Sequence, residues 1–177
     1  MISINYKNKG FTLVETLVAI SILSLSILAG FTAVQNGLKS SLTAKNQIVA
    51  FYLVQEAMEY VKNKRDSNAL DFINGGPSTW LTGLSACNSP SVCYIDVPSD
   101  VITACSGVNS TCPNLVIKNS NGLYGYNAAG VTTNFKRAIT YQTVSADEVT
   151  FTIWISWTQG LSTKSFQVTH SLFNRLQ

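Results

Sequence analysis

The chain has 177 residues and a formal net charge of +3, from 12 lysines and arginines against 9 aspartates and glutamates. Only 12% of its residues are charged, which is about half of the usual share. This composition argues against an intrinsically disordered chain, which combines low hydrophobicity with high charge. The small basic excess argues against a dedicated nucleic-acid-binding protein, and one histidine with four cysteines leaves few ligands for a metal enzyme.

A long apolar segment occupies residues 11–34 and contains a single charged residue, Glu15. As an α-helix it would measure about 36 Å, enough to cross a bilayer core of about 30 Å, and it is long for a helix buried in a soluble core. Lys7 and Lys9 precede it, and no acidic residue occurs before Glu15. The positive-inside rule therefore predicts a single-pass membrane protein with a cytoplasmic N-terminus and the rest outside.

A secretory signal peptide is the alternative explanation of this segment. Signal peptides end in small residues at a cleavage site, whereas residues 27–29 read Ile-Leu-Ala, with a large residue where a small one is needed. A carboxylate four residues into the apolar run is also atypical. The pattern therefore favours a membrane-spanning helix.

Glu15 needs a partner, because an acidic residue at the bilayer centre costs about 2.5–3.5 kcal/mol. No Lys, Arg or His occurs between Phe11 and Asn36. A cut between Gly10 and Phe11 would create an α-ammonium group one helical turn from Glu15, and the two charges would then pair within one chain or between neighbouring chains. The alternative is that the Glu15 carboxylate simply extends to the cytoplasmic headgroups.

The segment KGFTLVE at residues 9–15, followed by the apolar run, resembles the processing site of type IV pilins and type II secretion pseudopilins. The resemblance is strong up to residue 65 and weak beyond it. It implies that prepilin peptidase removes a leader, residues 1–10, by cutting between Gly10 and Phe11, and that the same enzyme methylates the N-terminal Phe11. It also implies that Glu15 contacts a neighbouring subunit during assembly.

The resemblance implies partners as well: prepilin peptidase, other pilin subunits, an assembly platform protein, a cytoplasmic ATPase and the membrane. We expect no cofactor and no nucleic acid. Major pilins often have a proline in the membrane half of the helix and a disulfide that staples the C-terminal loop. Here Gly30 is the one helix breaker in that half, either a weak point or a tolerated glycine, and no cysteine follows Cys112.

The helix is expected to continue beyond the membrane. Residues 35–65 have an amphipathic pattern, with apolar residues at three-, four- and seven-residue spacing; with Val34, these are Leu38, Leu42, Val49, Tyr52, Leu53, Ala57, Tyr60 and Val61. We predict one helix over residues 12–65, and Asn74-Gly75-Gly76-Pro77 is expected to end any helical tendency. Lys62, Lys64 and Arg65 would then cap its C-terminus, the alternative being a contact with DNA.

The rest of the chain predicts a loop-rich region over residues 66–131 and an antiparallel sheet over residues 132–177. The loop-rich region contains candidate strands at 92–97 and 115–118. The sheet is indicated by alternation, with turns at 145–147 and 159–163; its expected inward residues are Phe135, Arg137, Ile139, Tyr141, Val149, Phe151, Ile153, Ile155, Trp157, Phe166, Val168, His170 and Leu172. The amphipathic helix half would cover this face, giving an α+β, pilin-like fold whose head comprises residues 35–177.

Four cysteines lie in the loop-rich region: Cys87, Cys93, Cys105 and Cys112. An even number of cysteines in an oxidising compartment predicts disulfides. Three connectivities are possible, and pairing of sequence neighbours, which closes the smallest loops, is favoured. Zinc is the alternative, but the spacings of six and seven residues fit a zinc knuckle poorly.

Little in the sequence indicates catalysis. His170 is predicted to be a half-buried, hydrogen-bonded structural residue, and Trp154 to be buried beneath the middle loops on the polar side of the sheet. Asp96, Asp100, Asp147 and Glu148 lack the density of a calcium loop and are expected to be solvated.

These features predict a structural subunit of a cell-surface or periplasmic filament, and not an enzyme. A minor pilin is favoured, with a minor pseudopilin of type II secretion as the alternative. A membrane-anchored adhesin or DNA-binding module is the candidate from a different class.

Overall fold

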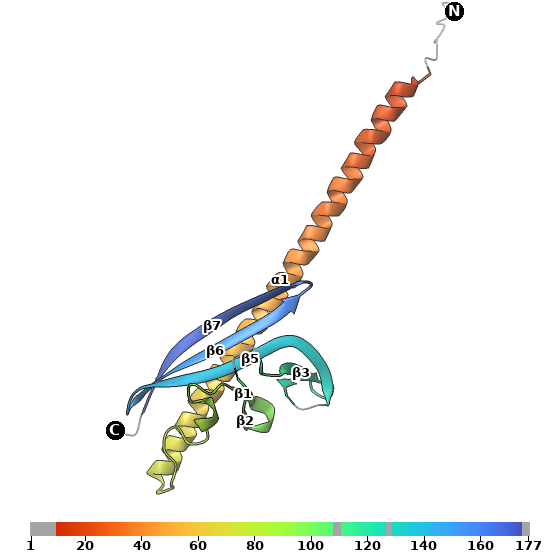
Figure 1. Cartoon of the computed structure of the whole chain (residues 1–177). Coiled ribbons are helices and arrows are strands. Elements are labelled where there is room, and N and C mark those ends of the chain that lie inside the picture. Colours follow the sequence, from red (N-terminus) through yellow and green to blue (C-terminus); the bar gives the residue numbers. More distant parts are fainter. Residues whose placement is uncertain (1–9, 108–110, 127–128, 175–177) are drawn as a thin grey trace, which may run out of the picture. The chain divides into compact units, whose positions relative to one another are not determined.

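The computed structural model describes residues 10–107, 111–126 and 129–174; most of the expected leader, with Lys7 and Lys9, lies outside the described residues. The chain forms one helix, α1 (Leu13–Ile73), followed by a seven-stranded sheet (Figure 1). The strands are β1 (Cys93–Asp96), β2 (Val101–Ala104), β3 (Asn114–Lys118), β4 (Tyr124–Gly125), β5 (Gly130–Ser145), β6 (Glu148–Gln159) and β7 (Ser162–Phe173). Two short 3₁₀ helices, η1 (Ser85–Cys87) and η2 (Val97–Ser99), lie between them. The fold is α+β and pilin-like, as predicted.

The chain divides into two units, one ending at Ala44 and the other beginning at Lys45. The described part of the first unit contains the N-terminal portion of α1, and every residue from Gly10 to Leu42 is exposed. The second unit, which we call the head, contains the rest of α1 and the whole sheet.

The predicted end of the helix near Arg65 is wrong, because α1 continues to Ile73. Its end has the two hydrogen bonds of a Schellman motif: Gly75 N–H donates to Phe72 O at 3.0 Å and Gly76 N–H donates to Asp71 O at 2.8 Å. Gly75 has a φ of +83°, a left-handed conformation that glycine adopts without steric cost. The stop is therefore encoded by the glycine pair and not by the basic residues ten positions earlier.

β5 organises the sheet. Along one edge it pairs with β6, which pairs in turn with β7; along the other edge it pairs with β1 and β3, and all of these pairs are antiparallel. The two predicted turns are confirmed, since β5 ends at Ser145 and β6 at Gln159. The predicted strands in the middle region correspond to β1 and β3. The strands β2 and β4 were not predicted, because one is largely exposed and the other has only two residues.

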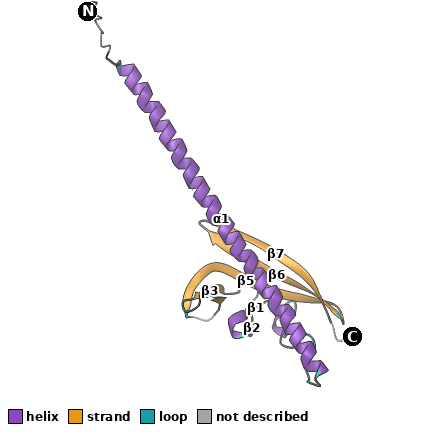
Figure 2. Cartoon of the chain, turned by 180° about the vertical axis from the view of Figure 1, so that it is seen from behind, coloured by secondary structure: helices purple, strands orange, loops and turns teal. Residues whose placement is uncertain are grey.

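The core of the head lies between α1 and the sheet, whose long strands cross the C-terminal part of the helix in both views (Figures 1 and 2). The helix contributes buried residues at three- and four-residue spacing, Ala50, Leu53, Val54, Ala57, Met58 and Val61. They pack with the inward residues of β5 and β6, including Ile139, Phe151, Ile153 and Ile155. The predicted cover is confirmed, although Tyr52, which we expected on the buried face, is 64% exposed.

A fully buried arginine lies within this core. Arg137 is 0% exposed and its Nη1 donates to Leu53 O at 2.6 Å and to Glu56 Oε2 at 2.7 Å. Its Nη2 donates to Ile95 O at 2.8 Å. One guanidinium therefore joins α1, β5 and β1. Alternation alone placed Arg137 on the inward face, but its partner on the helix could not be inferred from the pattern.

Two expectations about single residues of the sheet have different outcomes. Trp154 is partly buried and packs against the small cluster formed by Val92, Cys112 and Ala138, in line with burial beneath the middle region. The prediction for His170 is wrong, because His170 is exposed. Alternation assigns a face to a strand residue but does not determine whether another element covers it at that point.

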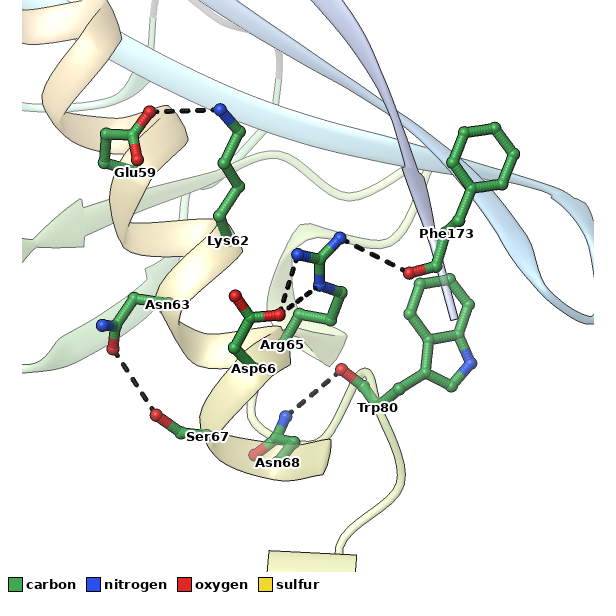
Figure 3. A network of polar contacts seen from close by, with 9 residues as sticks. All are labelled: Glu59, Lys62, Asn63, Arg65, Asp66, Ser67, Asn68, Trp80 and Phe173. Atoms are coloured by element: carbon green, nitrogen blue, oxygen red, sulfur yellow. Dashed lines mark hydrogen bonds and ion pairs between the residues drawn. The ribbon is translucent and has the colours of Figure 1, made fainter. Parts of the chain in front are cut away.

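The basic run near the middle of the head portion of α1 does not cap the helix. Lys62 pairs with Glu59 at 3.1 Å and Lys64 with Asp100 at 3.4 Å. The buried Arg65 contacts Asp66 at 2.8 Å and donates to Phe173 O at 3.5 Å. Figure 3 shows the contacts of Lys62 and Arg65 beside the hydrogen bond from Asn68 to Trp80 O. Each cation of this run thus has a partner within the head.

The contact between Tyr60 and Asp100 predicts a pH-dependent contribution to stability. The Tyr60 hydroxyl donates to Asp100 Oδ1 at 2.6 Å, which holds the pKa of the Asp100 carboxyl below its usual value, and burial together with this contact raises the pKa of Tyr60. A lowered carboxyl pKa stabilises the fold above the unfolded value of about 3.9, and this contribution is lost as the pH falls through the folded pKa. A raised tyrosine pKa stabilises below about 10 and is lost as the pH rises through the folded value.

We expect Tyr60→Phe to lower the free energy of unfolding at pH 7 by about 0.5–1 kcal/mol, a small effect because the Asp100 side chain is 67% exposed. The acid-side decline in stability should also become shallower. Urea unfolding of the full chain in detergent at pH 7 and pH 3 measures both effects. Tyr52→Phe, at an exposed tyrosine of the same helix, is the control. An equal loss for Tyr60→Phe at both pH values would contradict the assignment.

Candidate functional site

The expected processing site is freely accessible in the described structure. Gly10 is exposed, and a Cβ atom built on it would meet nothing within 4 Å. Phe11 is 85% exposed, and α1 begins two residues later, at Leu13. The Gly10–Phe11 bond therefore lies in non-helical backbone immediately before the helix, where an enzyme can bind the chain in an extended form.

Thr12 and Glu15 form a capping box at the start of α1. The Thr12 N–H and Thr12 Oγ1 each donate to Glu15 Oε2 at 2.9 Å, and the Glu15 N–H donates to Thr12 Oγ1 at 3.2 Å. Sequence reasoning missed this arrangement, although Thr-x-x-Glu before an apolar run is its signal. Before any cleavage, the Glu15 carboxylate thus already has donors within its own chain.

Several hydroxyl groups in the apolar part of α1 form hydrogen bonds within the helix. Four side-chain hydroxyls donate to a backbone carbonyl one turn earlier, at 2.8–2.9 Å; these belong to Thr16, Ser21, Ser26 and Thr32. In hydrocarbon, where no water satisfies a polar group, such bonds remove the cost of a hydroxyl. By length and composition the helix is able to cross a membrane.

The comparison with family models matches residues 5–31 to the prokaryotic N-terminal methylation motif. The chain carries the signature of type IV pilins and pseudopilins. No curated protein and no solved structure matched the chain. The motif supports a pilin- or pseudopilin-like structural subunit, and it implies processing by prepilin peptidase and association with other pilin subunits. Together with the apolar helix it fits a pilin-like protein with an N-terminal membrane anchor.

The head of this pilin-like protein contains two disulfides, between Cys87 and Cys93 and between Cys105 and Cys112. This is the pairing of sequence neighbours that the spacing favoured. Cys87 and Cys93 are fully buried in the main core and connect η1 to β1. The second disulfide connects the end of β2 to the segment before β3 and lies beside Trp154. All four cysteines thus hold the short elements between α1 and β5.

The head of the pilin-like chain does not gather the acidic residues that we considered as calcium ligands. Asp100 contacts Tyr60 and Lys64, whereas Asp147 accepts a hydrogen bond from Asn174 at 3.0 Å. Among the described residues there is no group of three His, Cys, Asp or Glu side chains that could hold a metal ion.

Proposed function

We propose that this chain is a minor pilin or pseudopilin. Prepilin peptidase cuts the precursor between Gly10 and Phe11, Phe11 is methylated, and the mature subunit enters a type IV pilus-like filament through its N-terminal helix. The observation that carries the proposal is the N-terminal methylation motif at residues 5–31, which includes the start of the exposed apolar portion of α1. In this proposal residues 11–34 span the membrane before assembly and the head lies outside the cytoplasm. A platform protein and an ATPase drive extrusion.

The minor role is supported by the head. Both disulfides lie before β3, and β6 and β7 complete the sheet without one. A chain of this kind suits a subunit that primes or joins a filament whose bulk is made by another protein. Identification of the protein that it accompanies in small amounts would distinguish a type IV pilus, where this is a major pilin, from type II secretion, where it is the secretion pseudopilins.

The processing step gives the first test. In a host that contains prepilin peptidase, the intact mass is expected to correspond to residues 11–177 with one added methyl group. Gly10→Val should leave the full-length precursor, because a branched side chain obstructs an enzyme that must bind the extended backbone at this position. The readout is intact-protein mass spectrometry of the membrane fraction.

Gly30→Val is the matched control, since a Cβ at either glycine would meet nothing within 4 Å. Its precursor should be processed as in the wild type. Retention of Met1 by the wild-type chain in the presence of an active peptidase, or a mature N-terminus near Gly30, would contradict the proposal.

A further inference from the structure

A hollow of about 610 Å³ lies on the outer face of the sheet in the head. Strands β5, β6 and β7 form its floor, where Lys136 is paired with Ser156 and Thr158 is paired with Thr163 in the strand register. Directly paired residues of antiparallel strands point to the same face. Because neighbouring residues of a strand point to opposite faces, this face is opposite the one on which Ile155 enters the core. The hollow is therefore on the side of the sheet that faces away from α1.

Trp154 is the aromatic side chain that lines the hollow. It is partly buried and packs against Val92, Cys112 and Ala138. The disulfide between Cys105 and Cys112 holds the segment before β3 beside it. Trp154 is therefore held in position while part of its surface remains available to the hollow.

Two asparagines contribute amide groups to the hollow, and Ser156 with several threonines contributes hydroxyls. Both amides are positioned by the fold, because Asn114 Nδ2 donates to Thr133 O at 2.7 Å and Asn134 Nδ2 donates to Thr158 O at 2.5 Å. The lining is thus rich in neutral groups that form hydrogen bonds.

Ser156 lies on the floor of the hollow and is only 5% exposed. Within the described part of the chain its hydroxyl forms no hydrogen bond. Buried polar groups normally have a partner. A hydroxyl group of a ligand bound in the hollow would supply one.

These groups favour a saccharide over other classes of ligand. The volume lies within the range of small-molecule sites, and hydroxyls and amides both donate and accept, as the hydroxyls of a sugar require. The C–H groups on the face of a pyranose ring pack on the electron-rich face of an indole. A single-stranded nucleic acid also stacks on aromatic rings, but its backbone needs a cationic groove, and Lys136 is the one charged residue among the described lining residues. We propose that the hollow binds a saccharide, with one pyranose ring against Trp154 and its hydroxyls at the amides and hydroxyls of the lining.

The experiment is a saturation-transfer NMR titration of the full chain in a detergent that has no sugar headgroup. The probes are cellobiose, lactose and maltose, which differ in linkage and in ring stereochemistry. We expect saturable binding of cellobiose, whose equatorial substituents leave flat C–H faces for stacking. Trp154→Ala should bind it about tenfold more weakly, and Trp154→Phe, which keeps an aromatic ring, should be intermediate. Sorbitol, which has hydroxyls but no ring, should bind more weakly than cellobiose.

Thr163→Arg and Thr169→Arg are a matched pair of variants that leave Trp154 in place. Both threonines are exposed residues of β7 on the same face. Each has a hydroxyl contact of 3.4 Å across to β6, Thr163 with Thr158 and Thr169 with Thr152. Thr163 lines the hollow, whereas Thr169 does not. Thr163→Arg should greatly weaken binding, because its long side chain occupies part of the hollow, and Thr169→Arg should bind as the wild type does.

Three results would overturn the proposal. Absence of binding of all three disaccharides by the wild type would show that the hollow holds solvent alone. Equal loss of binding in the two arginine variants would place the sugar outside the hollow. Binding of oligothymidylate in place of the disaccharides would identify a nucleic-acid site.

Discussion

Glu15→Gln is expected to leave cleavage after Gly10 intact and to reduce incorporation into filaments by at least about tenfold. The amide oxygen of glutamine still accepts from Thr12 N–H, so the capping box survives. What disappears is the negative charge that would pair with the Phe11 ammonium of an adjacent subunit. In a low-dielectric setting an unpaired ammonium is costly, and an incoming subunit would lose the contact that fixes its axial position. Fractionation of sheared filaments and membranes, with immunodetection of the subunit, measures incorporation.

Thr12→Ala is the matched control for this experiment. It removes the hydroxyl that caps Glu15 N–H at 3.2 Å but keeps the carboxylate. If Glu15 acts by docking, Thr12→Ala should assemble nearly as the wild type does, at a cost of about 1 kcal/mol of helix stability. If Glu15 acts only as a cap, Thr12→Ala should fail and Glu15→Gln should assemble. Normal assembly of both variants would favour a carboxylate that merely reaches the headgroups.

Glu56→Ala is expected to destabilise the head by about 3–5 kcal/mol, because it leaves the buried Arg137 cation without a counter-charge. Arg137→Met should cost less. The carboxylate that it leaves behind belongs to a side chain that is 34% exposed, and water can solvate it. Substitution of Glu56, the more exposed partner, is therefore expected to lower the free energy of unfolding more than substitution of the buried Arg137. Denaturant unfolding of the full chain in detergent, followed by tryptophan fluorescence, reports on the head, which contains all three tryptophans.

Glu59→Ala is the control for this pair. Glu59 lies three residues further along α1 and forms an exposed ion pair with Lys62, which is worth at most about 1 kcal/mol. In the double variant, Arg137→Met should recover most of the stability that Glu56→Ala loses. If Glu56→Ala costs no more than Glu59→Ala, the carbonyls of Leu53 and Ile95 are sufficient partners for the guanidinium.

Local patterns predicted much of this molecule, and contacts between distant residues account for the rest. The methylation motif, the apolar helix and the long C-terminal strands are each specified by residues close together in the chain. Alternation correctly placed Arg137 on the inward face. Its partner Glu56 lies 81 residues away, and no periodic pattern in the sequence indicates that the two residues pair. Asp96 was expected to be solvated, but it is only 6% exposed, and its Oδ1 lies close to Gly125 of β4, a contact between separate strands that no local pattern indicates.

One local signal was present but was not used, since Thr12-x-x-Glu15 specified the capping box. At the other end of the helix the sequence offers two signals, the basic residues at 62–65 and the turn residues Asn74-Gly75-Gly76-Pro77, and the glycine pair specifies the end. The short strands β2 and β4 left no comparable signal, since neither has the alternation of a half-buried strand.

The hydrogen bonds from side-chain hydroxyls to backbone carbonyls in the apolar helix have a consequence for the transfer of the subunit from membrane to filament. A serine or threonine hydroxyl that donates to a backbone carbonyl of its own helix needs no hydrogen-bond acceptor outside the helix. It can therefore face either lipid or protein without losing this bond; the four such residues are Thr16, Ser21, Ser26 and Thr32. Moving this helix from a bilayer into a bundle of like helices exchanges one set of apolar neighbours for another and breaks none of these four bonds. In the proposed filament, the polar contribution that distinguishes the stored from the assembled subunit would then come from the groups outside these four bonds, above all Glu15 and the terminal amine. Pairing of those two groups would therefore control the free-energy difference between the two states.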